Sequence, residues 1–373
     1  MGPDAGFPAE ESEGIALSFR TEAREILLLG GDGFLGGHIA RELMRAGRRV
    51  TTLSRGRHAP VEGAERLIAD RRDAASLAAA LTGRRFDMTV DLAAYEAIDV
   101  ELLWRVPGAA LGRTVMISTG QVYLVTESGR RAHREPDSGR PLMRDPGPGS
   151  VEYVKWKYGV GKRAAEAVFM SLRRHHGVRG LILRLPVVQG EGDPTLRLWA
   201  WLERMLDGSP VFLPDGARRA TRFVEVNDLA RLIEKLAGGA SPRAAVYNLA
   251  APRVTSLRRF LVLAARAAGA SPRFIPVPAA ALSESGLDLD AWPFAGHWSS
   301  VLDPSRARRD LGFNGTPPED YLPRLVRRCL EHRPDQSHFG YAQRAAELAM
   351  IERLEARPIG SRGDAPAPGR SIA

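Results

Sequence analysis

The sequence predicts an α/β protein in which a doubly wound, parallel sheet is followed by a smaller C-terminal lobe. Three observations support this fold class. Short apolar stretches alternate with amphipathic helical patterns along residues 25–250. Some stretches, such as 26–29, are apolar throughout, as expected of strands buried on both faces of a parallel sheet. A proline-rich segment with an aromatic cluster then breaks the alternation at 269–303, which indicates a separate lobe.

Order is expected from residue 25, because residues 1–24 are rich in Gly, Pro, Glu and Ala and are predicted to form a disordered tail. The first unit is a strand at 26–29, a glycine turn, a helix that stops at Gly47, and a strand at 50–53. Gly47 suits a helix end, since glycine readily adopts the left-handed conformation. Further strands are predicted at 65–70, 86–94, 113–118, 179–185 and 245–250, and further helices at 74–82, 154–175, 195–207, 228–237, 256–268 and 304–311.

Segment 126–150 is a long stretch rich in Gly, Pro and Arg. A stretch of this length without regular structure is usually a functional flap or disordered. Arg131, His133 and Arg134 could hold an anionic substrate, although a solvated loop is the favoured interpretation. The expected organisation is a core at 25–330, its substrate lobe formed mainly by about 187–222 and 252–330, and a C-terminal helix with a disordered tail at 331–373.

Composition excludes several classes of protein. The longest apolar runs, such as 260–265, are too short to cross a bilayer, and the acidic N-terminus lacks a signal-peptide pattern. Cys329 is the only cysteine, so neither a disulfide framework nor a thiolate metal cluster is expected, and the predicted compartment is the cytoplasm. No metal site is predicted, because the eight histidines show no metal-ligand spacing.

The net charge of +9 raises the question of nucleic-acid binding. The 49 arginines and four lysines are spread along the chain rather than gathered in one run, so a nucleic-acid partner is not favoured. Three of the lysines, however, lie close together at positions 155, 157 and 162.

The segment "LLLGGDGFLGG" carries overlapping glycine fingerprints, Gly30-x-x-Gly33-x-x-Gly36 and Gly31-x-Gly33-x-x-Gly36. It follows an apolar strand and opens a helix, which is the context that a dinucleotide-binding Rossmann turn requires. Glycine allows the tight turn and lets the backbone approach a pyrophosphate at the helix N-terminus. The predicted contacts in this turn are Gly30, Gly33, Phe34, Leu35 and Gly36.

The second strand ends without the acid that usually holds the ribose hydroxyls of NAD. Ser54, Arg55 and Arg57 stand there instead, and an arginine at this point can pair with a 2′-phosphate. NADP is therefore favoured over NAD as the cofactor. Asp70, at the end of the third strand, is positioned to accept a hydrogen bond from the adenine amino group.

The segment "VEYVKWKYGVGK" contains two Tyr-x-x-x-Lys frames, Tyr153…Lys157 and Tyr158…Lys162. At this spacing the two side chains share a helical face, and the ammonium can stabilise a phenolate for acid/base chemistry. The frames differ by about 140° around a helix, so both cannot face one cofactor. The second frame is selected because its intervening glycines leave room beside the pair, whereas the first has bulky side chains.

Several motifs occur in an order that resembles the extended short-chain dehydrogenase/reductases of the NAD-dependent epimerase/dehydratase family. They are "GGDGFLG", "DRRD", "ISTGQVY", "YGVGK", "LRLPVVQGEGD", "FVEVNDLA", "YNLA" and "LDPSRARRDLGF", within about residues 25–330. The resemblance implies a Rossmann domain with a small substrate lobe, catalysis by Thr119, Tyr158 and Lys162, and a homodimer. It also implies cofactor contacts from Ser54, Arg55, Asp70, Arg71, Leu92, Ala93, Ala94, Lys162 and Leu185.

Departures from the family pattern narrow the expected reaction. Gly120 and Gln121 replace the Asp-Glu pair with which the sugar 4,6-dehydratases expel water, so elimination is disfavoured. The family's diphosphate-contacting arginine falls at Thr221, with Arg219 and Arg222 adjacent. The expected substrate contacts are Ser118, Gln121, Arg219 and Arg222. The expected function is NAD(P)-dependent oxidation, reduction or epimerisation at a secondary alcohol or ketone of a sugar-like small molecule.

Two segments, "STGQVYLVTESGRRAHRE" and "WPFAGHWSSVLDPSRARRDLGF", look like the chloroplast stem-loop-binding proteins, a subgroup in which RNA binding has been associated with this fold. Those proteins lack the Tyr-x-x-x-Lys pair, whereas this chain retains it, which favours an enzyme. The alternative is a catalytically silent NADP-binding module that binds RNA or senses the cofactor.

Overall fold

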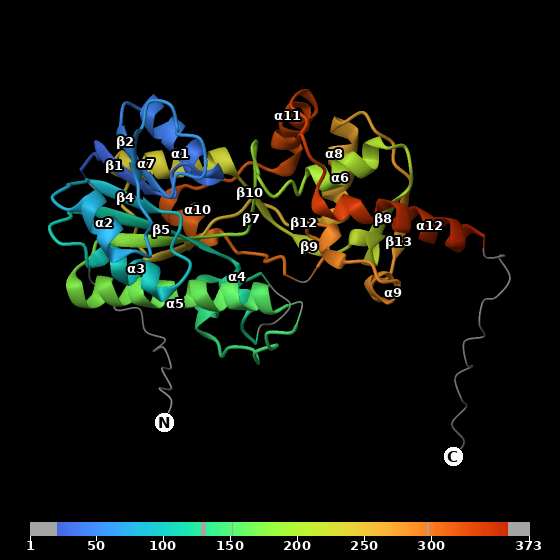
Figure 1. Ribbon diagram of the computed structural model, residues 1–373, viewed down its shortest axis with the longest axis horizontal. Coiled ribbons are helices and arrows are strands. Elements are labelled where there is room, and N and C mark those ends of the chain that lie inside the picture. The colour runs from blue at the N-terminus through green and yellow to red at the C-terminus, as the bar shows by residue number, and fades with distance from the viewer. Residues whose placement is uncertain (1–20, 128–131, 151, 297, 357–373) are drawn as a thin grey trace, which may run out of the picture.

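A computed structural model describes residues 21–127, 132–150, 152–296 and 298–356. Most of the predicted N-terminal tail, Arg131 and the end of the predicted C-terminal tail lie outside these residues. The described chain forms a sheet domain and a lobe beside it, with the lobe at the right of Figure 1. Among the described helices, none is both long and apolar enough to cross a membrane.

The centre of the larger domain is a seven-stranded sheet in the order β11-β6-β5-β4-β1-β2-β3. Every neighbouring pair is parallel. The order reverses between β1 and β4, and open α/β sheets bind ligands outside the carboxyl ends of the strands at such a point. The bounds are β1 (Glu25–Leu29), β2 (Arg49–Ser54), β3 (Glu65–Ile68), β4 (Met88–Asp91), β5 (Arg113–Thr119), β6 (Gly180–Leu185) and β11 (Val246–Asn248).

Helices cover both faces of this sheet, which confirms the predicted doubly wound fold class. On one face α1 (Phe34–Arg45) packs against α7 (Val226–Ala237), and α10 (Ser305–Leu311) lies beside β11 (Figure 1). On the other face α5 (Tyr153–His176) packs against α3 (Ala97–Trp104), which also contacts α2 (Ala74–Leu81). The helix faces carry apolar residues at helical spacing, and the strands are buried on both sides except at the edge strand β3.

The predicted bounds of two elements are longer than the observed ones. Strand β4 ends at Asp91, because Leu92, Ala93 and Ala94 leave the sheet and form the loop at its carboxyl end. Helix α6 (Trp199–Leu206) begins four residues later than predicted, after a turn at Asp193–Leu198 in which Leu196 has a positive φ of 53°.

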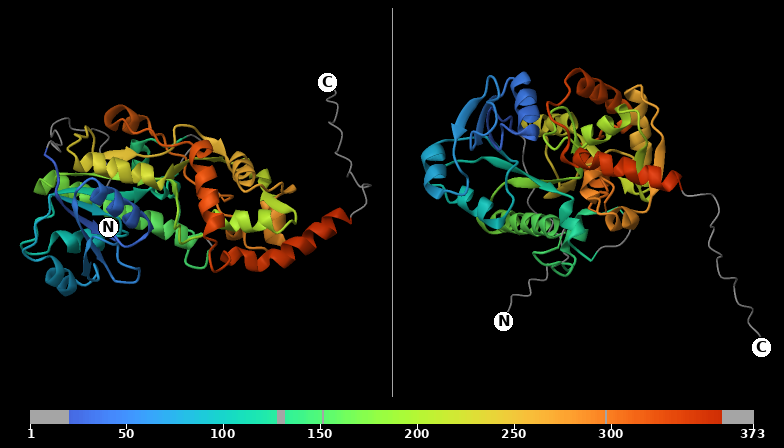
Figure 2. Two further views of the ribbon diagram at one scale, coloured as in Figure 1. Left: turned by 90° about the horizontal axis from the view of Figure 1, so that it is seen from above. Right: turned by 45° about the vertical axis from the view of Figure 1, so that its right-hand side comes forward.

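The lobe has its own apolar core, which contains the buried side chains of Trp201, Phe212, Phe260 and Trp292. Two short strand pairs, β10·β7 and β12·β9, lie between the domain and this core (Figures 1 and 2). The remaining elements are β7 (Val187–Gln189), β8 (Val211–Pro214), β9 (Ala220–Thr221), β10 (Phe223–Glu225), β12 (Thr255–Ser256), α8 (Leu257–Ala267), β13 (Phe274–Val277), α9 (Ala279–Glu284), α11 (Pro318–Glu331) and α12 (Arg344–Glu355).

The C-terminal helix α12 is attached to the lobe through a buried ion pair. Arg204 of α6 donates to Glu347 of α12 over 2.8 Å, and neither side chain is exposed. Arg344, at the start of α12, pairs with both Glu347 and Asp207. The helix is therefore part of the lobe's packed structure.

Part of segment 126–150 is packed against the domain. His133 is buried, stacks on Tyr123 with ring centroids 4.9 Å apart, and forms a backbone bridge with Leu302. Glu135–Gly139 forms a 3₁₀ helix in which Glu135 is also buried. The favoured interpretation of a solvated loop is wrong for His133, whose buried ring packs against the domain, whereas Arg134 is exposed and pairs with Asp303.

Candidate active site

The glycine turn joins β1 to α1 with almost no space between backbone segments. Gly30 has a φ of +80°, and a Cβ at Gly36 would lie 2.4 Å from the carbonyl oxygen of Gly31. A Cβ at Gly33 would meet nothing closer than 3.4 Å, so its outer side is open. The first N–H groups of α1, from Phe34 onward, have no partner within the helix. The turn thus has the shape and the donors that a dinucleotide diphosphate requires.

The predicted residues around this turn have different surroundings. Ala93 lies beside the turn, since a Cβ at Gly30 would be 3.3 Å from the Cβ of Ala93. Asp70 is exposed, and its Oδ1 accepts from the backbone N–H of Arg72. Arg71 instead turns inward and pairs through both Nη atoms with Asp91, at 2.6 and 2.9 Å. Its guanidinium therefore holds the carboxyl end of β4 rather than projecting outward.

A carboxylate of the glycine turn, which the sequence analysis did not identify as part of the site, lies beside the end of β2. Ser54 donates to Asp32 of the glycine turn over 2.6 Å, and Arg66 of β3 donates to the same carboxylate over 3.0 Å. Arg55 and Arg57, on which the NADP prediction rests, are exposed. The sequence could have indicated this carboxylate, because Asp32 lies within the glycine fingerprint, between Gly31 and Gly33.

The second Tyr-x-x-x-Lys frame meets the end of β5. Tyr158 lies beside Thr119, the last residue of that strand, whose hydroxyl lowers the pKa of the phenol. Lys162 is buried, and its Nζ donates to the carbonyl oxygen of Ile117 over 3.0 Å. In the first frame, by contrast, Lys157 is exposed and Tyr153 stacks on Trp156 with centroids 6.1 Å apart. The structure thus brings Thr119, Tyr158 and Lys162 together, whereas Tyr153 and Lys157 line a cavity beside Tyr158.

The glycines between Tyr158 and Lys162 have a different role from the one expected. A Cβ at Gly159 would lie 2.5 Å from Val125, and a Cβ at Gly161 would lie 2.8 Å from the carbonyl oxygen of Tyr95. They let α5 pack closely on α4 (Gln121–Leu124) and on the loop after β4. The expectation that they leave room for a substrate is wrong, because protein atoms fill that space.

Burial shifts the pKa values of Tyr158 and Lys162 in opposite directions. Tyr158 is 39% exposed, yet partial burial of its phenol raises its pKa to about 12, an effect that Thr119 reduces and the neighbouring Tyr95 reinforces. Burial lowers the pKa of Lys162 to about 8, although Asp91 and Glu166 favour its charged form. At neutral pH the pair is therefore a protonated phenol beside an ammonium that is close to its titration range.

Tyr95 is a further member of the site that the sequence did not indicate. The Lys162 Nζ lies 4.9 Å from the centre of its ring, and the rings of Tyr95 and Tyr158 are 6.2 Å apart. Asp99 accepts from the backbone N–H groups of Tyr95 and Glu96 and so fixes this loop. A cavity of about 380 Å³ adjoins the pair, and its lining is Tyr95, Glu96, Tyr153, Val154, Lys157 and Tyr158.

A buried polar network lies behind the site. Ser118 is buried and donates to Glu166, which also accepts from the guanidinium of Arg184. Arg184 donates further to Tyr123, over 2.8 Å, and burial raises the pKa of that phenol to about 12. The hydroxyl of Ser118, predicted to contact the substrate, is thus engaged in this network behind Thr119.

The other predicted substrate residues differ in their exposure to solvent and in the hydrogen bonds that they already form. Gln121 is partly buried at the start of α4, where its N–H donates to Thr119. Arg222 donates to the carbonyl oxygens of Leu302 and Pro252, which occupies two of its nitrogens. Arg219 is exposed beside β9. Of the two arginines, only Arg219 presents its side chain to solvent.

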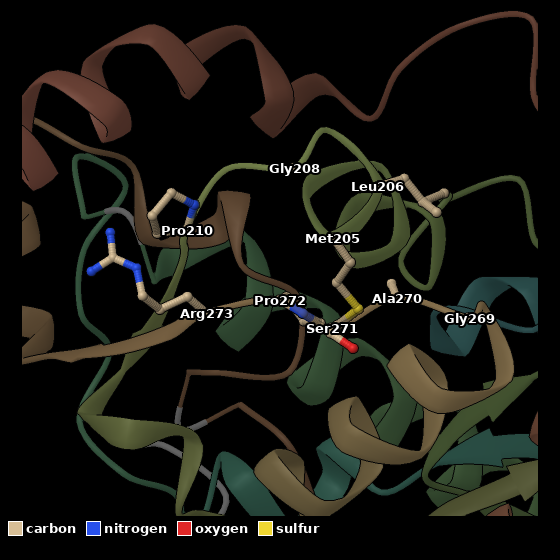
Figure 3. A pocket seen from close by; sticks show the side chains of 9 residues that line it. All are labelled: Met205, Leu206, Gly208, Pro210, Gly269, Ala270, Ser271, Pro272 and Arg273. Carbon is tan, nitrogen blue, oxygen red and sulfur yellow. The ribbon is translucent and has the colours of Figure 1, made fainter.

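A second cavity, of about 520 Å³, lies on the lobe and contains none of the predicted site residues (Figure 3). In the described parts of the chain no group of three or more His, Cys, Asp or Glu side chains could hold a metal ion. The candidate site is therefore the region where the glycine turn, the end of β5 and the start of α5 meet. The residues lining the lobe cavity are Met205, Leu206, Gly208, Pro210, Gly269, Ala270, Ser271, Pro272 and Arg273.

Comparison with solved structures supports the fold. A UDP-glucose 4-epimerase from Thermotoga maritima, solved with UDP-glucose, is 19% identical, with a TM-score of 0.65 over 83% of this chain and 99% of its own. A dTDP-glucose 4,6-dehydratase from Streptomyces venezuelae, solved with NAD, is 22% identical, with a TM-score of 0.62 over 83% of this chain and 97% of its own.

Comparison of sequences extends this result. The chloroplast stem-loop binding protein of 41 kDa b of Arabidopsis thaliana is 24% identical over 262 residues, which are 66% of this chain. The match spans 64% of that relative, less than two thirds of its length. The sequence profile of the NAD dependent epimerase/dehydratase family matches residues 26–250, more than half of the chain. The chain therefore belongs to the NAD dependent epimerase/dehydratase family.

Proposed function

We propose that this protein is an NAD(P)-dependent oxidoreductase or epimerase that acts at a secondary alcohol or ketone of a sugar-like metabolite. The observation that carries the proposal is that Tyr158 and Thr119 lie together at the end of β5, with the buried ammonium of Lys162 on the same helical face as the phenol. These groups lie at the carboxyl edge of the sheet, where the glycine turn would hold the dinucleotide through Gly33 and the N–H groups of Phe34 and Leu35.

The three side chains divide the proton chemistry among them. A bound nicotinamide supplies the hydride acceptor or donor. Thr119 would hold the reacting oxygen by a hydrogen bond, and Tyr158 would give its proton to a ketone oxygen or take one from an alcohol. With a pKa near 12, Tyr158 is poised as the proton donor. The Lys162 ammonium lowers the cost of the phenolate that forms when the proton leaves.

Two observations support epimerisation or net redox rather than elimination. The position after Thr119 is Gly120, where a Cβ would lie 2.1 Å from the Oγ of Ser300, so an acid cannot be placed there without moving Ser300. The next residue, Gln121, has a neutral amide that cannot serve as the acid which expels water. Dehydration therefore lacks its usual carboxyl pair in this chain.

A nucleotide-diphosphate sugar is the substrate class to test first. The family relatives solved with UDP-glucose or named for dTDP-glucose act on such compounds. In this chain the exposed Arg219 beside β9 is the residue proposed to pair with a diphosphate, since guanidinium recognises phosphate through paired hydrogen bonds. Arg222 would support the site by holding the backbone at Leu302 and Pro252.

The test is turnover of a panel of nucleotide sugars by the full chain with NAD or NADP, followed by nicotinamide absorbance and by chromatography of the sugars. Tyr158→Phe should lower turnover by about a hundredfold or more, while cofactor affinity stays within about twofold. Tyr341→Phe, on the lobe, is the matched control and should retain activity. Full activity of Tyr158→Phe would overturn the proposed mechanism.

RNA binding is the second candidate, because the relative from Arabidopsis thaliana is named for stem-loop binding and the net charge of this chain is +9. RNA binding ranks second, because Thr119, Tyr158 and Lys162 are all present and lie together, with Lys162 held by the carbonyl oxygen of Ile117. Tight RNA binding that weakens steeply with salt, together with no turnover of any nucleotide sugar, would favour this candidate.

A further inference from the structure

A buried carboxylate lies behind the end of β2, although the sequence of that strand contains no acid there. Asp32 accepts from Ser54 through Oδ2, at 2.6 Å, and from Arg66 through the same oxygen, at 3.0 Å. Its side chain has no exposed surface. The other oxygen, Oδ1, accepts no hydrogen bond from any described residue. The glycine turn thus places a buried negative charge directly behind Ser54, beside the end of β2.

Asp32 determines which hydrogen bonds Ser54 can form. A hydroxyl has one proton to donate and two lone pairs that accept. Ser54 gives its proton to Asp32 and accepts from the N–H of Gly56 over 3.1 Å. Ser54 is partly exposed, and its Oγ therefore retains one lone pair and no proton. Ser54 can accept a hydrogen bond from a sugar hydroxyl, but it cannot donate one to a phosphate.

The guanidinium of Arg66, which pairs with Asp32, also forms a second hydrogen bond. Arg66 donates through Nε to Asp32 and through Nη2 to the carbonyl oxygen of His58, at 2.7 Å. A 2′-phosphate would bring further negative charge close to the Asp32 carboxylate, which is shielded from water and therefore poorly screened. A ribose with a free 2′-hydroxyl brings a donor and no charge, so it matches the acceptor that Ser54 offers in front of the buried Asp32.

We propose that Asp32 makes this protein selective for NAD, the dinucleotide with an unmodified 2′-hydroxyl, over NADP. Ser54 is the residue that contacts the ribose, and Asp32 is a positioning residue that fixes the Ser54 proton and supplies the charge. The inference rests on the proposed function, in which the glycine turn binds the dinucleotide. It reverses the expectation from Arg55 and Arg57, whose side chains are exposed.

The experiment is a fluorescence titration of the purified full chain with NADH and with NADPH at one ionic strength. The wild type should bind NADH at least about tenfold more tightly than NADPH, which corresponds to about 1.4 kcal/mol. Asp32→Asn should bring the ratio of the two dissociation constants close to one, because the charge is lost and Arg66 is released. Glu62→Gln, which removes an exposed carboxylate from the loop between β2 and β3, is the control and should leave the ratio unchanged.

Arg66→Gln keeps the test decisive if Asp32→Asn does not fold, as circular dichroism would reveal. It leaves the carboxylate without its cation, so the preference for NADH should increase. Equal affinities or an NADPH preference in the wild type would overturn the inference while leaving the proposed function intact. An unchanged ratio in folded Asp32→Asn would also overturn it. Failure of the wild type to bind either nucleotide would overturn the proposed function and this inference together.

Discussion

The ammonium of Lys162 lies 4.9 Å from the centre of the Tyr95 ring, so the residue after the β4 loop covers the cation of the acid/base pair. An aromatic face stabilises a nearby ammonium by about 0.5–2 kcal/mol, depending on how far water is excluded. Lys162 is buried and donates to the backbone carbonyl of Ile117, and the Tyr95 ring is an aromatic neighbour of its ammonium.

Replacement of Tyr95 tests this contact. Tyr95→Ala should lower kcat/KM about fivefold, because Lys162 loses the ring that helps to hold its charged form in place. Tyr95→Phe keeps the ring and should stay within about twofold of the wild type. The measurement is steady-state kinetics with the best nucleotide sugar found. If the phenylalanine variant loses as much activity as the alanine variant, the Tyr95 hydroxyl rather than its ring is the functional group.

The depressed pKa of Lys162 predicts a stability that changes with pH. Burial lowers the pKa to about 8 in the folded chain, whereas the unfolded chain keeps the ordinary value of 10.5. Between these values the unfolded state binds the extra proton, so stability rises with pH; below about pH 8 both states are protonated and this contribution is flat. From about pH 8 to about pH 9.5 the wild type should gain on the order of 2 kcal/mol relative to Lys162→Met.

Urea unfolding of the two proteins at matched pH values measures this difference, since groups other than Lys162 cancel in the comparison. Lys162→Arg serves as the control, because arginine stays charged throughout and should show no such rise. A constant difference between wild type and Lys162→Met would mean that Lys162 keeps an ordinary pKa.

The glycine turn and the Tyr158–Lys162 frame could be predicted from the sequence because each is a local pattern with one geometric meaning. The fingerprint from Gly30 to Gly36 requires a strand before it and a helix after it, and both were recognisable. The choice between the two frames needed only the 3.6-residue repeat and the sizes of the intervening side chains. That choice led to the buried Lys162, although Gly159 and Gly161 allow close helix packing and do not make room for a substrate.

Other parts of the site depend on contacts between distant segments, which no local pattern encodes. Arg71 is paired with Asp91, twenty residues away, and Ser118 with Glu166, forty-eight residues away. Which way such side chains turn is decided by the charge that the fold brings beside them. The position of Asp32 could have been predicted, because the fold class alone places the glycine turn next to the end of β2.

Two glycines of the turn should have separable roles. Gly36→Ala places a Cβ 2.4 Å from the carbonyl oxygen of Gly31 and should destabilise the fold by about 1–3 kcal/mol, because α1 must move away from the turn. Gly33→Ala meets nothing closer than 3.4 Å, so stability should change little while the methyl group obstructs the diphosphate and NADH affinity falls about tenfold or more.

Urea unfolding and NADH titration of both variants distinguish the roles. Gly149→Ala, where a Cβ would meet nothing within 4 Å, is the control for both measurements. Unaltered NADH affinity in Gly33→Ala would argue against a diphosphate at this turn.

The network behind the site should contribute to stability through Glu166. Glu166→Gln leaves the buried Arg184 guanidinium without its negative partner and replaces one accepting carboxylate oxygen by an amide NH₂ that can only donate. Loss of one partner of a buried ion pair costs about 3–5 kcal/mol. Thermal and urea unfolding should show a loss in this range. A loss below about 1 kcal/mol would show that water or another group compensates Arg184.

Because Glu347 attaches α12 to the lobe, its replacement should lower the stability of the protein strongly, and removal of its charged partner as well should restore most of that stability. Its carboxylate accepts from Arg204 at 2.8 Å and from Arg344 at 2.9 Å, and Arg204 lies between the rings of Trp292 and Tyr341, 5.9 and 5.7 Å from their centres. Glu347→Gln leaves Arg204 charged, unexposed and without a counter-ion, so the free energy of unfolding should fall by about 3–5 kcal/mol.

The double variant Arg204→Met, Glu347→Leu removes both charges and should recover most of this loss, because apolar side chains of similar volume fill the space without a desolvation cost. The exposed pair Glu42–Arg45 is the matched control, and Glu42→Gln should change stability by less than about 1 kcal/mol. If Glu347→Gln costs no more than this control, α12 does not stabilise the lobe. If the double variant stays as unstable as the single one, the cost lies in packing around the Arg204 stem and not in its unpaired charge.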